Sequence, residues 1–378
     1  MEIQEYLRVA KRENNNKRPY LYVNAYQGKH IPVAPSKTVS MCAELAEKIS
    51  RAYPGEKLLV TGFAETATAL GALVASRMEN ACCYLHTTRE DTGEGEVLYF
   101  TESHSHAVDQ KLVLKGLDKA VEQADRLVFV EDEVTTGNTI EKLITLLEKR
   151  YGRKLRFTIS SVLNSMTPER RQELLERGRE CIFLHQIPPG YGIHTLEHYD
   201  YSDGQEQSRG WEKASCSLRV LHVPSDLDTR TVTDIRKLDQ TCRHMADMIY
   251  QERKEDLKGG SVLVLGTEEF MYPAVWLGNW LEEQGEVGEV RTHSTTRSPI
   301  MVSRSKGYPL HSRVSLPGVY DRNRNTYLYN LAGYDAVVVL TDSGSEDLTG
   351  LEELTGRLSA AGNHNIFVYR WSYDEEYL

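Results

Sequence analysis

Short apolar runs alternate with amphipathic helical patterns along the first half of the chain. The apolar runs predict strands, and the segments with helical periodicity predict helices. The predicted strands are 57–61, 82–87, 126–131, 156–163 and 181–185, and the predicted helices are 38–53, 66–79, 138–151 and 168–177. The last helix has a clear start signal, because Thr167 suits the N-cap and Pro168 suits the first helical position. This alternation predicts an α/β fold, in which helices flank both faces of a parallel sheet.

A polar stretch at residues 188–210, rich in glycine and tyrosine, interrupts this pattern and is typical of a linker or of a loop over a site. The pattern then restarts. The predicted strands are 218–223, 261–265, a strand near Val290, 335–341 and 365–370, and the predicted helices are 231–255 and 274–284. We therefore predict a first domain over residues 1–190, a linker or loop over 191–214, and a second α/β domain over 215–378.

The second half repeats landmarks of the first half in the same order. Gly62 recurs as Gly266, Arg89 as Arg297 and Asp132 as Asp342, at offsets of 204, 208 and 210 residues. Offsets that rise this smoothly favour duplication of one α/β unit. Chance similarity between two α/β domains is the alternative. The second domain is thus interpreted as a degenerate repeat of the first.

Composition narrows the class of protein. The chain has 378 residues, of which 40% are hydrophobic and 26% charged, so two domains with ordinary cores are expected. The net charge of −10 argues against a nucleic-acid or anionic-membrane partner. No apolar stretch approaches the roughly 18 residues of a membrane span, and the N-terminus lacks a secretory apolar region. Six cysteines without metal-ligand spacing favour reduced thiols over a disulfide framework. We therefore expect a cytoplasmic protein.

The segment LVFVEDEVTTGNTI, residues 127–140, has the most specific chemistry. An apolar strand ends in Glu131, Asp132 and Glu133, and T-T-G-x-T then leads into a helix. The unsatisfied N–H groups at a helix N-terminus lie at the positive end of the helix dipole and favour a phosphate. Gly137 lets the backbone wrap closely, whereas the carboxylates need hydroxyl donors. A ribose 5-phosphate satisfies both sets; an acid-rich turn capped by threonines is the alternative.

This segment resembles the loop that binds 5-phosphoribosyl 1-pyrophosphate (PRPP) in type I phosphoribosyltransferases, an apolar strand followed by (E/D)-D-x-x-T-T-G-x-T. The resemblance implies the fold of that family and transfer of ribose 5-phosphate from PRPP to a nitrogenous base or base-like acceptor, with release of pyrophosphate. The PRPP-binding residues that it implies are Glu131, Asp132, Glu133, Val134, Thr135, Thr136, Gly137, Asn138 and Thr139. Glu131 and Asp132 would fix the 2- and 3-hydroxyls and stabilise positive charge on the ribose.

Other segments fall where this family has its remaining site residues. The predicted pyrophosphate loop is Gly62, Phe63, Ala64, Glu65 and Thr66. The resemblance gives Arg89 a place facing pyrophosphate, and it makes residues 100–112 a flexible catalytic loop. His104, His106 and Lys111 of this loop are expected to close on pyrophosphate. The alternatives are an ordinary helix start at the first segment and solvated histidines in the second.

Magnesium is expected to arrive with PRPP and to keep several waters, so the resemblance predicts no metal ligands from the protein. It also implies a homodimer. The hood over the acceptor is expected from residues 20–35 or from 187–198, and neither segment identifies the acceptor. A PRPP-binding regulator or scaffold without turnover is the alternative function.

More narrowly, the chain resembles phosphoribosyltransferases of bacterial tellurium-resistance-type stress operons, which have a C-terminal domain named for T-R-S-P. Residues 296–299 read T-R-S-P, and this family is implicated in making a nucleoside-like metabolite. The second domain is open to three interpretations: a structural partner, a site for a phosphate-bearing ligand, or a second catalytic site. Its predicted pocket residues are Thr296, Arg297, Ser298, Asp342, Ser343, Gly344 and Ser345. Pairing of Arg297 with Asp342 or Glu346, as a strut between strand ends, is the alternative to this pocket.

Overall fold

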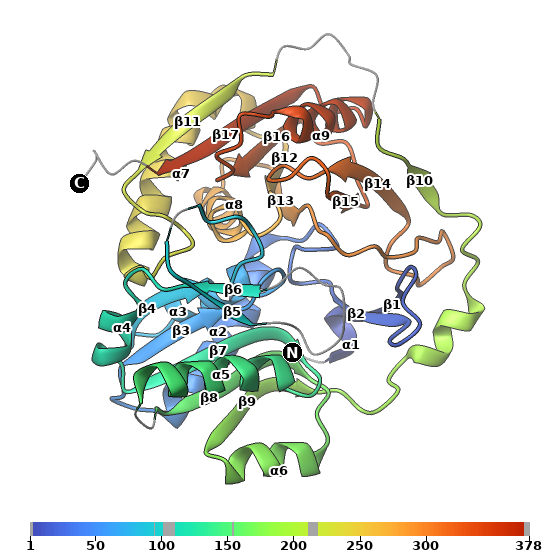
Figure 1. The fold of residues 1–378 in the computed structure, drawn as a ribbon. Helices are drawn as coiled ribbons and strands as arrows, with labels where there is room; N and C mark the ends of the chain where they lie inside the picture. Colours follow the sequence, from blue (N-terminus) through green and yellow to red (C-terminus); the bar gives the residue numbers. More distant parts are fainter. Residues whose placement is uncertain (1–2, 94, 101–109, 153–154, 211–217, 374–378) are drawn as a thin grey trace. The chain divides into compact units, whose positions relative to one another are not determined.

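The computed structural model describes residues 3–93, 95–100, 110–152, 155–210 and 218–373, and Figure 1 labels its helices and strands. The chain divides into two compact units. The first-sheet unit contains Ser40–Pro189 and Leu227–Thr241, and the second-sheet unit contains Met1–Val39, Gly190–Asp226 and Cys242–Leu378. The units therefore differ from the predicted domains. Met1–Val39, at the start of the predicted first domain, belongs to the second-sheet unit, and Leu227–Thr241, within the predicted second domain, belongs to the first-sheet unit. The domain boundaries at 190 and 215 stay a prediction.

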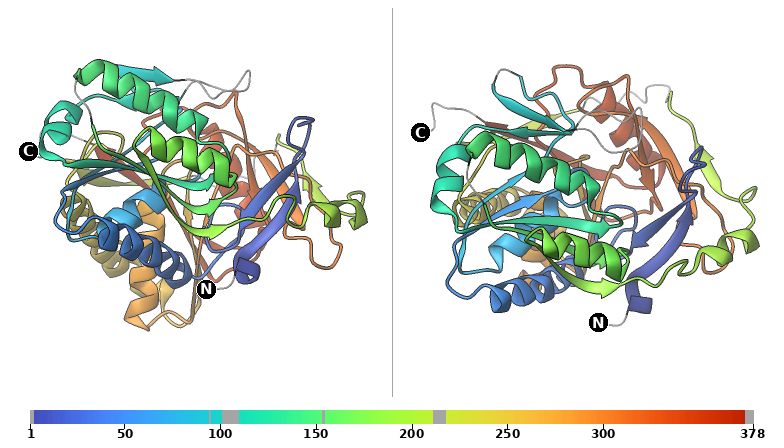
Figure 2. Two further views of the ribbon diagram at one scale, coloured as in Figure 1. Left: turned by 90° about the horizontal axis from the view of Figure 1, so that it is seen from below. Right: turned by 60° about the horizontal axis from the view of Figure 1, so that its bottom comes forward.

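The first-sheet unit is built on five parallel strands in the order β4-β3-β7-β8-β9. These strands are β3 (Leu58–Gly62), β4 (Ala81–His86), β7 (Arg126–Val134), β8 (Phe157–Asn164) and β9 (Arg179–Gln186). The helices are α2 (Pro35–Ala52), α3 (Thr68–Ser76), α4 (Leu117–Gln123), α5 (Asn138–Tyr151) and α6 (Pro168–Glu176). In Figure 2, α2 and α3 cover one face of this sheet, whereas α4 and α5 cover the other. The predicted α/β fold is confirmed.

Every strand and helix predicted for the first half is present, including α6 with its cap. The Thr167 hydroxyl accepts a hydrogen bond of 3.2 Å from the Arg170 backbone N–H. The hairpin of β5 (Val97–Phe100) and β6 (Gln110–Val113), by contrast, was not predicted. Its strands are only four residues long, and their pattern gave no separate signal.

One hydrophobic core cluster of the first-sheet unit lies between the sheet and helices α4 and α5. Phe63, Phe129 and Phe157 pack in series, with ring centroids 5.8 Å apart in both pairs that contain Phe129. On the opposite face, α3 approaches β3 so closely that a Cβ on Gly71 would lie 2.7 Å from the Gly62 Cα. The end of β3, where the predicted pyrophosphate loop begins, is therefore held by tight packing on both faces.

The second-sheet unit also contains five parallel strands, in the order β11-β17-β16-β12-β13. They are β11 (Val220–Ser225), β12 (Ser261–Gly266), β13 (Glu289–Ser294), β16 (Ala336–Thr341) and β17 (Asn365–Tyr373). The helices of its second half are α7 (Ile235–Leu257), α8 (Tyr272–Gln284) and α9 (Thr349–Ala360). All seven strands and helices predicted for the second half are present.

Smaller elements complete the second-sheet unit. They are α1 (Ile3–Tyr6), the hairpin β1 (Leu7–Lys11) and β2 (Tyr20–Asn24), the 3-10 helix η1 (Ile193–His198), β10 (Gln205–Gln207), β14 (Ser312–Pro317) and β15 (Asn325–Tyr329). β10 pairs with β14, which also pairs with β15. The stretch at 188–210 therefore contains regular structure that its polar, glycine-rich composition did not predict.

The two sheets share their topology, which supports the predicted repeat. Read from the opposite edge, the order of the second sheet is β13-β12-β16-β17-β11. Its first four strands occupy the same places, in the same sequence order, as β4-β3-β7-β8 of the first sheet. In the sequence, an antiparallel hairpin follows the edge strand in both units: β5–β6 lies between β4 and β7, and β14–β15 lies between β13 and β16. Only the outer strand differs, because β9 follows the others in the sequence and β11 precedes them.

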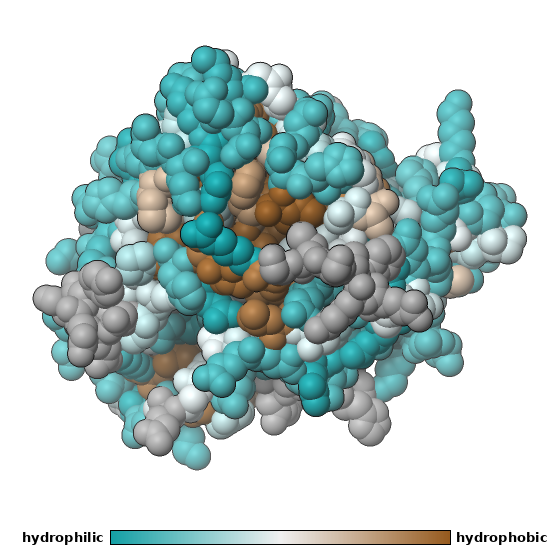
Figure 3. Space-filling view, turned by 90° about the horizontal axis from the view of Figure 1, so that it is seen from above, coloured by the Kyte–Doolittle hydropathy of each residue, from teal (hydrophilic) through white to brown (hydrophobic). Residues whose placement is uncertain are grey.

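Hydrophilic residues cover most of the face shown in Figure 3. Within the described part of the chain, every helix is too short or too polar to cross a membrane. The described cysteines Cys42, Cys82, Cys83, Cys181 and Cys242 are free thiols, as predicted.

Candidate functional site

The predicted site lies where the strand order of the first sheet reverses. From β3 the chain moves outward to the edge strand β4 and then returns to add β7 on the other side of β3. Ligands of open α/β sheets bind outside the carboxyl ends of the strands at such a switch point. The loop after β3 holds the predicted pyrophosphate residues, and the loop after β7 holds the predicted PRPP residues. The sheet therefore brings the two predicted loops together.

The loop after β7 has the geometry expected of an anion site. Thr135 and Thr136 are exposed between the end of β7 and the start of α5, and Gly137 has a φ of +72°. This left-handed conformation favours glycine. Among the described residues, the backbone N–H groups of Gly137 and Thr139 have no hydrogen-bond acceptor. These donors lie at the N-terminus of a helix, where a phosphate is the natural partner.

The acidic residues that precede this loop connect it to the loop after β3. Asp132 is partly buried, and its carboxylate forms a side-chain hydrogen bond with Thr66. It also accepts a 2.8 Å bond from the Glu133 backbone N–H, whereas Glu133 accepts a 2.9 Å bond from the Ser165 hydroxyl. Burial first, and then the neighbouring Glu133, raise the pKa of Asp132 above its ordinary value. The carboxylate of Asp132 is therefore held in a fixed position at an electrostatic cost.

The predicted pyrophosphate loop is held by side chains from the next strand and from the β5–β6 hairpin. The Ala64 N–H donates a 2.9 Å bond to Thr87 Oγ1, and Gln110 Nε2 donates a 3.3 Å bond to the Ala64 carbonyl. Thr87 Oγ1 in turn donates to Gln110 Oε1 at 3.3 Å. Glu65 is buried, and the Ala64–Glu65 peptide bond is cis. This network fixes the backbone of the loop against β4.

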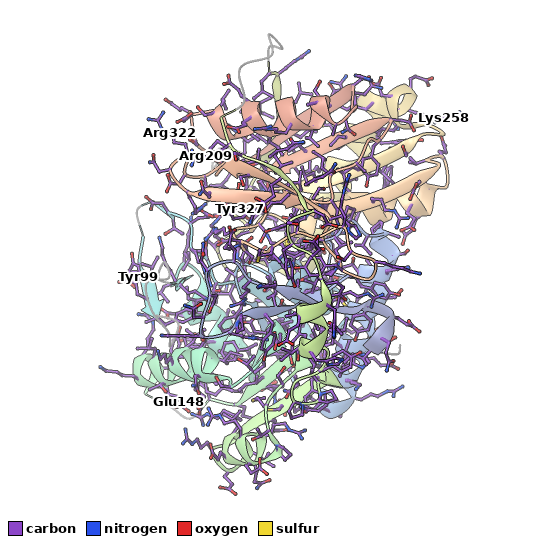
Figure 4. The ribbon with its side chains drawn as sticks, turned by 90° about the vertical axis from the view of Figure 1, so that its right-hand side faces the viewer. Tyr99, Glu148, Arg209, Lys258, Arg322 and Tyr327 are labelled. Carbon is purple, nitrogen blue, oxygen red and sulfur yellow. The ribbon has the colours of Figure 1, made fainter. Side chains whose placement is uncertain are left out.

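The predicted cations of the pyrophosphate side, Arg89 and Lys111, lie on paired backbone segments. Backbone N–H and carbonyl groups of Lys111 and Thr88 form reciprocal 2.8 Å hydrogen bonds, so Lys111 lies beside the residue that precedes the half-buried Arg89. The Lys111 Nζ is 6.0 Å from the ring centroid of Tyr99, which Figure 4 labels. His104 and His106 lie outside the described residues. Their predicted role, like that of the other site residues, stays a prediction.

Three residues that position these loops were not found from the sequence. Thr87 and Gln110 hold Ala64, and Arg170 donates a 2.9 Å bond to the Thr136 carbonyl from the next helix along the chain. Thr87 is two residues before the predicted Arg89, but nothing marked its hydroxyl as a support. Gln110 and Arg170 gave no local signal, because each acts through a contact with a distant part of the chain.

In the second-sheet unit, Arg297 has a different environment from the one expected. Its Nε lies 3.0 Å from Glu268 Oε2 and its Nη2 lies 3.1 Å from Glu269 Oε1, and both glutamate side chains are fully buried. Arg324 also pairs with Glu268, at 2.6 Å. Asp342 accepts a 2.5 Å bond from the Tyr320 hydroxyl. Arg297 thus ties together two buried carboxylates, as a strut would, and its pairing with Asp342 or Glu346 stays a prediction.

The other residues of the predicted second pocket follow the ends of β13 and β16. Thr296 is buried and pairs with Tyr327 through reciprocal backbone bonds. Ser298 is half-buried. Ser343 is buried and donates a 2.9 Å bond from its hydroxyl to the Val319 carbonyl, whereas Gly344 is exposed. These contacts give the loop a structure of its own. A ligand pocket at this position stays a prediction.

Neither segment proposed for the acceptor hood is singled out by the structure. Residues 20–35, which include β2, belong to the second-sheet unit, and so does the part of 187–198 from Gly190 onward. Within the described residues there is no group of three or more histidine, cysteine, aspartate or glutamate side chains placed to hold a metal ion. The arrival of magnesium with PRPP therefore stays a prediction.

Comparisons with known proteins match two segments of the chain to protein families. Residues 6–183 match the family described as phosphoribosyl transferase, and residues 230–357 match the family described as the TRSP domain C-terminal to it. No curated protein sequence matches the chain.

Several solved structures resemble part of the chain. Adenine phosphoribosyltransferase from Rhodothermus marinus is 13% identical with a TM-score of 0.34, and the match covers 49% of this chain and 96% of that one. Adenine phosphoribosyltransferase from Leishmania donovani is 14% identical with a TM-score of 0.37, and the match covers 49% of this chain and 78% of that one. Orotate phosphoribosyltransferase from Aeropyrum pernix is 17% identical with a TM-score of 0.26, and the match covers 43% of this chain and 76% of that one.

Proposed function

We propose that the protein is a magnesium-dependent phosphoribosyltransferase, which transfers ribose 5-phosphate from PRPP to a nitrogenous base or base-like acceptor and releases pyrophosphate. The proposal starts from the match of residues 6–183 to the phosphoribosyl transferase family and of residues 230–357 to the TRSP domain. The observation that carries this proposal is the loop after β7, where open backbone donors at a helix N-terminus stand beside partly buried carboxylates.

The 5-phosphate and the ribose hydroxyls of PRPP both find complementary chemistry at this loop. The 5-phosphate would accept hydrogen bonds from the N–H groups of Gly137 and Thr139 and from the threonine hydroxyls. Glu131 and Asp132 would accept hydrogen bonds from the 2- and 3-hydroxyls. A phosphate and a diol a few ångströms apart match both sets of groups, which a simple phosphate ligand would not.

The chemical step proposed here is displacement at C1 of the ribose. The bond between C1 and pyrophosphate breaks with its electron pair on the leaving group, and a nitrogen of the acceptor supplies the new bond at C1. The carboxylates of Glu131 and Asp132 stabilise positive charge on the ribose during this step, and Arg89 and Lys111 face the departing pyrophosphate. Magnesium prefers oxygen ligands; carried by PRPP, it would neutralise charge on the pyrophosphate.

Binding of PRPP with magnesium is expected to stabilise the folded protein, because the phosphate and diol contacts exist only in the native state. At a concentration 100 times its Kd the gain is about 2.7 kcal/mol. Thermal unfolding with millimolar PRPP and magnesium measures it, with magnesium alone as the control. An unchanged melting temperature would contradict the assignment of the loop.

Turnover itself is tested by release of pyrophosphate from PRPP across a panel of nucleobases and base-like amides. Release with one acceptor class identifies the substrate class. The alternative is a PRPP-binding regulator or scaffold, for which PRPP binds and no acceptor releases pyrophosphate. The Thr87 and Gln110 network favours the enzyme, because a sensor of ribose 5-phosphate needs no fixed pyrophosphate loop.

Further expectations belong to the same proposal. The composition predicts a cytoplasmic location, and the sequence resemblance implies a homodimer and a role in a tellurium-resistance-type stress operon, in the synthesis of a nucleoside-like metabolite. The oligomeric state is measured by light scattering of the purified protein, and a monomer at all concentrations would contradict the dimer.

A further inference from the structure

Arg170 of α6 is bonded to the candidate PRPP loop on the side opposite its open donors. Its Nε donates a 2.9 Å bond to the Thr136 carbonyl, and its Nη2 donates a 3.1 Å bond to the Asn138 side-chain oxygen. The same Nη2 lies 2.5 Å from Glu141 Oε2, and Nη1 lies 3.0 Å from Glu173. One guanidinium therefore connects α6 to both sides of Gly137 and to the first turn of α5.

These contacts determine where the loop's donors point. A peptide group is planar and trans, so its carbonyl and its N–H point in opposite directions. Because Arg170 holds the Thr136 carbonyl toward α6, the Gly137 N–H of the same peptide points away from α6. This N–H group has no acceptor among the described residues. Arg170 therefore fixes the orientation of a donor that it does not itself contact.

The charge of Arg170 is already balanced, so its role is geometric. Glu141 and Glu173 both pair with it, and its side chain is only 19% exposed. Gly137 is the most mobile kind of residue in the free chain, and a loop ordered before binding does not lose that freedom again when the ligand binds. An arginine fork suits this task, since its donors have a rigid, planar arrangement.

We propose that Arg170 is a positioning residue that presets the loop at Thr136–Asn138 for the 5-phosphate of PRPP. This inference rests on the proposed function. It assigns a residue outside the PRPP motif to the phosphate end of the site, and it predicts that pyrophosphate binding does not depend on that residue.

The chain offers a matched control. Arg177, also on the α6 side, pairs with the other oxygen of Glu141 at 3.1 Å, is 60% exposed, and forms no hydrogen bond with Thr136 or Asn138. Arg177→Ala thus removes a tie between α5 and α6 while the loop keeps its support. Arg170→Ala removes both.

The test measures binding of PRPP, ribose 5-phosphate and pyrophosphate, each with magnesium, to the full-length protein by calorimetry. Arg170→Ala is expected to weaken PRPP and ribose 5-phosphate about tenfold or more, which corresponds to about 1.4 kcal/mol, and to leave pyrophosphate unchanged. Arg177→Ala is expected to bind all three as the wild type does. In turnover assays the Arg170 variant should show a raised KM for PRPP with kcat retained, since the phosphate does not react.

Two results would overturn the inference alone: wild-type affinity in Arg170→Ala, or equal weakening in both arginine variants, which would assign the effect to the α5–α6 tie. If the wild-type protein binds neither PRPP nor ribose 5-phosphate, the proposed function fails and the inference fails with it. Should Arg170→Ala not fold, Arg170→Gln, which keeps the stem and an amide donor, takes its place in the same measurements.

Discussion

Replacement of Asp132 by asparagine is expected to lower kcat by about 10²- to 10³-fold, which is the loss found for single preorganised electrostatic groups, about 2.7–4 kcal/mol. Asparagine keeps the shape of the side chain but removes the negative charge opposite the ribose. The fixed position of this carboxylate, bonded to Thr66 and to the Glu133 N–H, is what gives the charge its effect.

The same variant is expected to be as stable as the wild type at neutral pH, or slightly more stable. Burial and Glu133 raise the pKa of Asp132, so the folded protein holds the proton of this group more tightly than the unfolded chain does. The charged form therefore costs stability above the folded-state pKa, and that cost disappears as the pH falls through it. Activity that needs the charged form should decline over the same fall in pH.

Steady-state kinetics and thermal unfolding of Asp132→Asn measure the two effects. Glu148→Gln is the control, because it makes the same chemical change near the far end of α5, where Glu148 pairs with Arg179 at 2.8 Å (Figure 4). Unchanged kcat in the Asp132 variant would show that the carboxylate is structural. A marked loss of stability would contradict the physical reason given for its pKa.

Replacement of Arg297 by alanine is expected to destabilise the second-sheet unit by about 3 kcal/mol, at the lower end of the 3–5 kcal/mol typical when one partner of a buried ion pair is removed. Arg324 remains at 2.6 Å from Glu268 and continues to balance that charge. Glu269, whose carboxylate is fully buried and 3.1 Å from Arg297, also loses an ion-pair partner.

Denaturant unfolding of Arg297→Ala gives the free energy directly. Arg322→Ala is the control, because Arg322 is 64% exposed, pairs with Asp347 at 3.3 Å, and lies in Figure 4 next to Arg209. It should change stability by no more than about 0.5 kcal/mol. If Arg297→Ala keeps its stability but loses affinity for a phosphorylated ligand, the predicted pocket is right and the strut is not the main role of this residue.

The sequence by itself determined the α/β class, the ten strands of the two parallel sheets in chain order, and the segment that forms the candidate site. Each of these depends on residues close together in the chain. A buried strand, a turn with glycine at positive φ and the first turn of a helix are consecutive, so the motif at residues 127–140 specifies its own local geometry. The repeat was also visible, because it preserves local motifs in the same order.

Only the tertiary structure decided how these parts are supported. Thr87 and Gln110 hold the loop at Ala64, Arg170 holds the carbonyl of Thr136, and Glu268 with Glu269 neutralises Arg297. It also decided that the segments Met1–Val39 and Leu227–Thr241 each join the unit of the other sheet. These contacts join residues far apart in the sequence. Their geometry follows from how sheets and helices pack, and no local pattern of residues records it.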